Sequence, residues 1–318
     1  MAMAYVFKPE GSVAHNLNRI LSQEIKAALN TLQQPDQNTG EAIHRIRKRI
    51  KKIRALFRLI RSELNQNDFQ RQNSYYRMIG QQLSSLRDAS VMINTLQKLR
   101  QAQPAGVSSQ VFSRLHKVLT AQQDQATRQF FDDPTQIGEL TKAFEQAPQR
   151  VTGLSKHHKG FGMIAPNLKT IYQRAQKALK RAVHKPSVNK LHELRKEVKT
   201  LWYHTRLLEP SWPGLLKAYG HELGQLGELL GNDHDYGVLA QLIDSDALRL
   251  PNQSTKKALL NELQQQRIGL QAQLFPLANR LLGEQAGTFV KRFERPWKLW
   301  RLEVKAKIIN QRLQAVYE

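Results

Sequence analysis

Apolar residues recur every three or four positions along almost the whole chain, which is the spacing of one buried face of an α-helix. Strand signals are scarce, because alternating runs of Val, Ile and Thr are few and no Asn-Gly or Asp-Gly pair joins two of them. We therefore expect an all-α protein. The predicted helices cover residues 12–32, 41–64, 68–100, 108–131, 164–184, 188–209, 213–231, 234–247, 254–282 and 285–315.

Turn and cap residues such as QQPDQNTG (33–40) and FDDPTQ (131–136) separate these helices, without a low-complexity linker. The stretch NDHD at 232–235 falls at the boundary between two predicted helices. Its residue types suit a metal ion, but we interpret it as a turn or a helix end. Asp88 and Asp235 are expected either to serve as turn or cap acids or to orient neighbouring cations.

The motif H-x-x-R-K-x-x-K occurs twice in the chain, beginning at His44 and at His192. In both copies an Arg follows fourteen residues after the His, at Arg58 and Arg206. A single short match of this kind can arise by chance, so it indicates a repeat only if the residues on both sides of the motif also match.

Two further blocks flank the motif in the same order. Upstream, residues 16–27 match 167–178 at Asn, Leu, Ile, Lys and Ala. Downstream, residues 80–92 match 227–239 at Gly, Asp and Val. We therefore predict an internal duplication within one domain spanning 1–318, with two similar helical halves related by a pseudo-two-fold axis. The halves are 1–150 and 151–318.

The first copy of the motif combines an apolar stripe with a basic one. Seven apolar residues at alternating spacings of three and four form the core face, namely Ile43, Ile46, Ile50, Ile53, Phe57, Ile60 and Leu64. The first basic stripe has the same spacing shifted by one residue and comprises His44, Arg47, Lys51, Arg54 and Arg58. The second basic stripe comprises His192, Arg195, Lys199, Trp202 and Arg206.

Like charges three or four residues apart on a helix cost roughly 0.2–0.5 kcal/mol per pair, so the first basic stripe stores on the order of 1 kcal/mol of repulsion. An anion along the stripe would relieve that repulsion. Because each basic stripe flanks a buried face, it would line the wall of a groove between helices, where screening is weak. Candidates for a second basic wall, on the first helix of each half, are Arg19, Lys26, Arg174 and Lys177.

The alternative is a solvated surface on which long basic side chains cover the core with their alkyl parts. Both interpretations stay open for the cations that point further from the apolar stripe, namely Arg45, Lys48, Arg49 and Lys52. His44 and His192 either contact an anion or only pack at the edge of the core.

The charge balance is the strongest feature of the composition. The 318 residues include 49 Lys plus Arg against 26 Asp plus Glu, a formal net charge of +23. Such a charge indicates a polyanionic partner, which could be DNA, RNA, an anionic membrane or an inorganic phosphate polymer. The chain has no cysteine, which excludes disulfides and thiolate metal sites. We expect a cytoplasmic protein, because no secretory signal or long apolar run is present.

Motifs of phosphate-transferring and hydrolytic enzymes are absent from the sequence. It contains no GxxxxGK[ST] loop, HExxH pair, GxSxG elbow or Rossmann glycine pattern, and no ExExK pattern of triphosphate-tunnel enzymes. We therefore expect no catalytic residues, no metal site and no cofactor.

Three features together resemble the CHAD family of α-helical domains. They are the duplicated H-x-x-R-K-x-x-K motif, the Y-x-R-A-x-K-A segment at 172–178, and LG-x-LL at 226–230 with a following Asp. The resemblance implies two pseudo-symmetric four-helix bundles around a basic central groove or pore. It also implies binding of inorganic polyphosphate, with polyphosphate granules as a place of association. The implied ligands are His44, Arg47, Lys48, Lys51, Arg54, Arg58, His192, Arg195, Lys196, Lys199 and Arg206.

Two functions of different classes remain. One is non-catalytic binding of polyphosphate or another phosphate-rich polyanion, and the alternative is binding of nucleic acid with the same basic surface. A single-strand binder should interleave stacking aromatic rings with its cations, but Trp202 is the only ring in the two stripes, so we favour polyphosphate. The basic, aromatic segment 291–307 could contact a membrane or a protein. We favour the alternative that Trp297 and Trp300 pack on a bundle.

Overall fold

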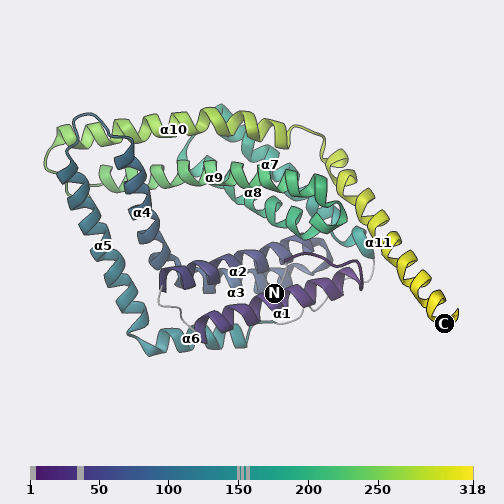
Figure 1. Ribbon diagram of the computed structural model, residues 1–318. Coiled ribbons are helices and arrows are strands. Elements are labelled where there is room, and N and C mark those ends of the chain that lie inside the picture. Colours follow the sequence, from purple (N-terminus) through teal and green to yellow (C-terminus); the bar gives the residue numbers. More distant parts are fainter. Residues whose placement is uncertain (1–4, 34–38, 149–150, 152–153, 155–157, 318) are drawn as a thin grey trace.

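The computed structural model of the protein describes residues 5–33, 39–148, 151, 154 and 158–317, and all the regular elements among these residues are helices (Figure 1). The predicted all-α class is confirmed. The α-helices are α1 (Val13–Gln33), α2 (Thr39–Leu59), α3 (Gln66–Gln82), α4 (Ser84–Gln101), α5 (Ser109–Phe131), α6 (Pro134–Glu145), α7 (Ala165–His184), α8 (Val188–Leu208), α9 (Pro213–Asp244), α10 (Gln253–Leu282) and α11 (Ala286–Tyr317). Short 3-10 turns are η1 (Arg61–Glu63), η2 (Gly160–Met163) and η3 (Glu209–Ser211).

Two of the predicted boundaries are wrong. The single helix expected at 68–100 is broken at Leu83, whose ψ of 8° separates α3 from α4. The break expected after residue 231 does not exist, because α9 is one helix of 32 residues. Local residue types favoured a turn there, but packing against α8 and α10 keeps the backbone helical.

One helix, α6, was not predicted at all. The stretch FDDPTQ reads as a turn because of its Asp and Pro residues, yet the same residues begin a helix. The carboxylate of Asp133 accepts a hydrogen bond from the Thr135 backbone N–H at 2.9 Å, and Pro134 occupies the first turn. The Asp-Pro pair is thus an N-cap signal at this position.

The helices of the second half, α7 to α10, pack side by side in chain order, and α10 also contacts α7 (Figure 1). In the first half, α2 contacts α1, α3 and α4, while α6 packs on α1 and α5. The two halves meet mainly where α2 contacts α8 and where α4 contacts α9.

Two hydrophobic clusters hold the helices together, and each contains residues of both halves. The main cluster includes all seven residues of the predicted apolar stripe, which are buried. It also includes five apolar residues of α8, namely Leu191, Leu194, Val198, Leu201 and Leu208. The second cluster joins α4 and α5 to the end of α9 and the start of α10, with Leu99, Phe112, Leu239 and Leu259 at its centre. Because both clusters cross between the halves, neither half has a core of its own.

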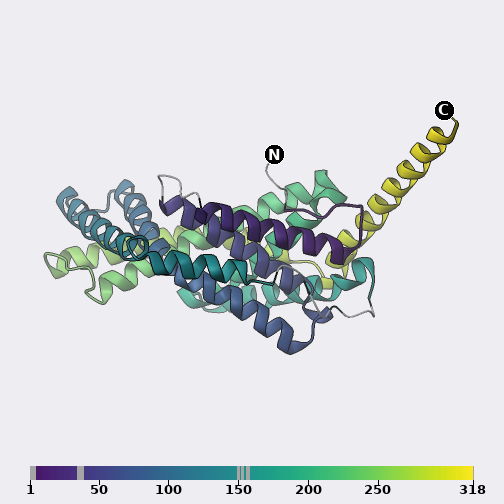
Figure 2. The same cartoon turned by 90° about the horizontal axis from the view of Figure 1, so that it is seen from below.

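Helix α11 extends away from the rest of the molecule (Figures 1 and 2). Its first part is anchored, because Trp297 is buried with its ring centroid 5.4 Å from that of Phe7 and 6.1 Å from that of Phe161. Trp300 is half-buried against Trp297. The expected packing of these two rings is confirmed. None of the described helices combines the length and apolar character that a membrane span requires.

Candidate anion-binding site

Helices α2 and α8, which carry the two basic stripes, are joined by two hydrogen bonds, one buried and one partly buried. The ring of His204 is fully buried, and its Nε2 lies 2.9 Å from the carbonyl oxygen of Ala55. Burial lowers the pKa of His204 to about 4, so the ring is neutral and Nε2 carries the proton that it donates to Ala55. Arg58 Nη1 donates to Thr200 Oγ1 at 2.8 Å. The spacing of the motif did not indicate Ala55, Thr200 or His204 as contacts between the two helices.

On α2, the arginines of the first basic stripe are half-buried, whereas His44, Lys48 and Lys51 are exposed. Arg54 Nε donates to Asn73 Oδ1 at 3.2 Å. Burial is the main cause that lowers the pKa of Arg54 to about 10, with neighbouring Arg58 as a second cause. Both guanidinium groups stay charged at neutral pH, in surroundings that disfavour charge.

Arg47 has a structural contact as well. Its Nη1 donates to the Gly80 carbonyl oxygen at 2.9 Å and to Ser84 Oγ at 3.0 Å. These bonds connect α2 with the end of α3 and the start of α4. Replacing Arg47 would therefore disturb the fold as well as the stripe.

On α8, the second basic stripe lies over glycines of α9. A methyl group added at Gly227 would lie 2.8 Å from Lys199 Cδ, and one added at Gly231 would lie 3.0 Å from an Nη atom of Arg195. A methyl group added at a third glycine of this row, Gly224, would lie 3.4 Å from Nε1 of the Trp202 indole. The missing side chains thus leave the space in which the stripe's long side chains lie.

Lys199, in the second basic stripe, is close to a cation of α2. Burial is the largest cause that lowers its pKa, and the positive charges of Arg195, of Lys48 on α2 and of Arg206 add to it. Its Nζ lies 4.3 Å from the centroid of the Trp202 ring, and Arg206 Cζ lies 4.9 Å from the same centroid. Trp202, which replaces the Arg54 of the first copy, is therefore held by cations of its own stripe.

Five cations of the two stripes form no ion pair with an acid of the described residues, although the charges of Glu197 and Glu228 oppose the lowering of the pKa of Arg58 and Lys199. No carboxylate lies within 4.0 Å of Arg54, Arg58, Arg195, Lys199 or Arg206. All five side chains are half-buried. Because burying a charge without a partner is costly, this arrangement favours an anion from outside the chain.

His192 lies against a second histidine that the sequence did not connect with it. The ring centroids of His192 and His234 are 4.5 Å apart, and Nδ1 of His192 is buried without a hydrogen-bond partner. Burial, then His234 and the nearby cations, lower the pKa of His192 to about 4. The ring is neutral at pH 7, which fits packing better than ionic contact with an anion.

The stretch NDHD lies inside α9, so its interpretation as a turn or helix end is wrong. Asp233 is fully buried and accepts hydrogen bonds from Arg267 Nε at 3.2 Å and from Gln271 Nε2 at 2.8 Å, both on α10. Asp235 pairs with the adjacent His234. Asp88 is likewise within a helix, α4, and exposed. Within the described residues, no three His, Asp or Glu side chains could share a metal ion.

Several predicted cations lie elsewhere or pair with acids. Arg19 Nη2 donates to the Val6 carbonyl oxygen at 2.7 Å and so fixes the N-terminal segment on α1. Arg49 and Lys52 both pair with the buried Glu24 of α1, at 3.1 and 2.6 Å. Arg45 lies 3.5 Å from Glu41. Lys196 pairs with Glu193 on the exposed face of α8, and Lys26 and Lys177 are exposed on α1 and α7.

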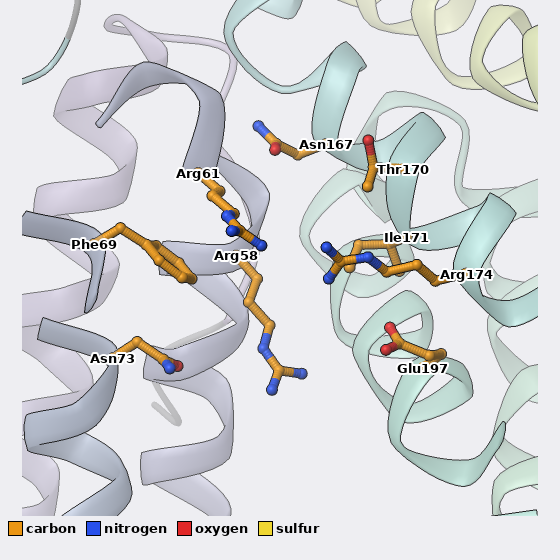
Figure 3. A pocket seen from close by; sticks show the side chains of 9 residues that line it. All are labelled: Arg58, Arg61, Phe69, Asn73, Asn167, Thr170, Ile171, Arg174 and Glu197. Atoms are coloured by element: carbon orange, nitrogen blue, oxygen red, sulfur yellow. The ribbon is translucent and has the colours of Figure 1, made fainter. Parts of the chain in front are cut away.

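A polar pocket of about 190 Å³ lies where the first basic stripe ends (Figure 3). Arg58, η1 and α3 form one wall, and α7 and α8 form the other. Figure 3 shows the guanidinium groups of Arg58 and Arg174 and the carboxylate of Glu197 pointing into the space between these walls. The sequence indicated Arg58 and Arg174, but not Arg61 or Glu197.

The fold and the site define a class of helical protein in which two basic helices pack against each other. The chain belongs to the CHAD domain family, whose model matches residues 21–244. This confirms the resemblance found in the sequence. No curated protein sequence matches the chain significantly.

Two solved structures have a similar fold. PptA from Streptomyces chartreusis has a TM-score of 0.58 and 16% sequence identity, over 87% of this chain and 100% of that chain. The CHAD domain from the plant Ricinus communis has a TM-score of 0.52 and 18% identity, over 89% of this chain and 95% of that chain. At these identities the likeness concerns the fold alone.

Proposed function

We propose that the protein binds inorganic polyphosphate, without altering it chemically, through the first and second basic stripes. The observation that carries this proposal is the group of five half-buried cations that have no carboxylate within 4.0 Å among the described residues. Lys48 of α2 also lies close enough to Lys199 on α8 to lower its pKa. A polyanion between the two helices would neutralise both stripes at once. Membership of the CHAD family supports the same ligand.

The proposed site lies in a basic groove between two pseudo-symmetric four-helix bundles, which together form one domain over residues 1–318. The order of the helices supports this arrangement. In the half 1–150, α1 and α2 precede α3 with α4 and then α5 with α6, whereas in the half 151–318, α7 and α8 precede the long helices α9 and α10. The pair α3 and α4 thus corresponds to the single helix α9, and the pair α5 and α6 corresponds to the single helix α10.

Polyphosphate has closely spaced anionic oxygens and no bases or sugars, so a row of cations is sufficient to recognise it. Arginine can bind two oxygens with its planar fork, and lysine acts as a movable point charge. An exposed contact contributes at most about 1 kcal/mol, so the affinity must come from many contacts along one chain. We therefore expect strong salt dependence and no release of phosphate from the bound polymer.

Nucleic acid is the alternative ligand, and the environment of Trp202 argues against its single-stranded form. The ring lies against Lys199 and Arg206 and packs beside Gly224. A base that stacks on this ring would have to displace a cation from it. The Lys199 and Arg206 contacts therefore favour a ligand that interacts with the cations rather than with the ring.

A competition titration tests the proposal. Long-chain polyphosphate, single-stranded DNA and duplex DNA are compared at fixed salt and equal concentration of negative charge, while release of phosphate is monitored. We expect polyphosphate to displace both DNA forms and to stay intact. Displacement of polyphosphate by DNA would favour nucleic-acid binding. If the proposal holds in vitro, labelled protein should collect on polyphosphate granules in the cytoplasm of cells that store the polymer.

A further inference from the structure

The polar pocket at the end of the first basic stripe differs from the rest of the site, because it contains an acid. Three arginines line it, namely Arg58, Arg61 and Arg174, together with the carboxylate of Glu197. Glu197 is half-buried and its Oε2 is buried without a hydrogen-bond partner. A simple polyanion channel gains nothing from a carboxylate among its cations.

The corresponding place in the first half contains ion pairs instead. In the sequence repeat, Arg49 occupies the position of Glu197, and Lys52 that of Thr200. Arg49 and Lys52 both pair with the buried Glu24, so these two cations have a counter-ion within the protein. In the second half no acid or base of the described residues pairs with Glu197, and the pocket is open.

The pocket has a volume of about 190 Å³, which is large enough for a phosphate group, since about 10–15 Å³ of this kind of volume already holds one water molecule. Amide and hydroxyl groups of Asn73, Asn167 and Thr170 complete its lining. Arg58 belongs both to the pocket and to the first basic stripe, so a polymer lying along α2 would bring its end here.

The chemistry of the lining distinguishes an end of the polymer from its interior. An ionised carboxylate only accepts hydrogen bonds, and an internal phosphate unit has only acceptor oxygens, so the two repel each other. A terminal unit has a second ionisation, with a pKa of about 6 in related phosphate groups, and its P–OH can donate to a carboxylate. Arginines would hold the remaining oxygens.

We propose that this pocket recognises the terminal phosphate group of a polyphosphate chain, with Glu197 accepting a hydrogen bond from its P–OH and Arg58, Arg61 and Arg174 binding its oxygens. The inference rests on the proposed function and deepens it. Burial raises the pKa of Glu197, while the charges of Arg58, Arg174 and Lys196 oppose that rise and Glu193 adds to it. In this environment the Glu197 carboxylate and the terminal phosphate group can therefore share one proton in a hydrogen bond.

Linear tripolyphosphate and cyclic trimetaphosphate test the inference, because both contain three phosphate units but the ring has no end. Affinities for both are measured at about pH 6, where the terminal group keeps part of its protons. We expect the wild-type protein to prefer the linear form. In Glu197→Gln the preference should fall about tenfold, because the amide also donates to internal units and a hydrogen bond to a charged group is lost.

Glu193→Gln is the matched control, since Glu193 lies one turn earlier on α8 and loses the same charge at the exposed surface. Its linear-to-cyclic ratio should equal that of the wild type. Arg61 is exposed and lines the pocket, so Arg61→Gln should weaken the binding of linear tripolyphosphate and leave the binding of cyclic trimetaphosphate unchanged. An unchanged linear-to-cyclic ratio in both Glu197→Gln and Arg61→Gln would refute the proposal that this pocket recognises the terminal phosphate group.

Long-chain polyphosphate, titrated with the same variants, separates the two proposals. Its many internal units outnumber its ends, so we expect Glu197→Gln and Arg61→Gln to bind it about as well as the wild type. If the variants bind long-chain polyphosphate normally and their linear-to-cyclic ratio is unchanged, the proposal on the terminal phosphate group fails and the proposed function stands. If the wild type bound no long-chain polyphosphate, the proposed function itself would fail.

Discussion

The row of glycines on α9 allows the position of one cation to be tested separately from its charge. A methyl group at Gly227 would lie 2.8 Å from Lys199 Cδ and 3.5 Å from its Nζ, so Gly227→Ala must move the lysine side chain. The backbone of α9 need not move, because the obstacle is the flexible part of Lys199. The variant thus keeps every charge and displaces one ammonium group of the second basic stripe.

The expected energies are small but separable. Gly to Ala in a helix gains up to about 1 kcal/mol, and displacement of Lys199 offsets part of this gain, so stability should stay within about 1 kcal/mol of the wild type. Loss of one ionic contact of up to about 1 kcal/mol should weaken polyphosphate binding by up to about fivefold. Urea unfolding measures the first quantity and calorimetric titration of polyphosphate the second.

Gly269→Ala is the control, because Gly269 lies in α10 and a methyl group added there would meet no atom within 4 Å. It should gain stability by helix propensity and bind polyphosphate like the wild type. Equal affinity of Gly227→Ala and the wild type would refute the reasoning that the glycine row positions Lys199 for the ligand.

Three further predictions concern the framework and the readout of the site. Asp233→Asn should lower the free energy of unfolding by about 3 kcal/mol in urea titrations, because it breaks the ion pair between this fully buried carboxylate and the half-buried Arg267; a loss below about 1 kcal/mol would contradict this role. The pKa of His204 falls from 6.5 to about 4 on folding, so the unfolded chain binds the proton more readily; stability should decline as the pH falls from about 6.5 to 4, by on the order of 3 kcal/mol for this group. His204→Gln should reduce that slope relative to the wild type, and an unchanged slope would exclude His204 as its source. Polyphosphate should change the tryptophan fluorescence by drawing Lys199 and Arg206 away from Trp202, and Trp202→Phe should abolish that change; a persisting signal would assign it to another tryptophan.

The sequence was sufficient to predict the helical class and the core face of α2, because both follow from a strict local periodicity. Ile43 and Phe57 are buried as the spacing requires. The continuity of α9 could not be predicted in this way. Its Asp233 resembles a cap residue in sequence, but in the structure it pairs with Arg267, 34 residues further along, on the helix α10 that packs against α9.

The site was predicted less completely than the fold. Spacing identified Arg58 and Lys199, since the stripe repeats in both halves. Spacing could not show that Arg19 binds the Val6 carbonyl oxygen, because that contact depends on how the N-terminal segment returns to α1. The spacing did not indicate Glu197, because its position in a pocket arises only when α2 and α8 cross. The one signal in the sequence is that the two copies differ here, with Arg49 at the position of Glu197.

Titration of long-chain polyphosphate against a paired set of variants tests the central claim most directly. Arg195→Gln with Lys199→Gln removes two cations of the second basic stripe, and Arg114→Gln with Lys117→Gln removes two from the exposed face of α5. The first pair should weaken binding by up to about thirtyfold, since each contact contributes up to about 1 kcal/mol, while the second pair binds like the wild type. Equal loss in the two pairs, with both folded by circular dichroism, would contradict a site between α2 and α8.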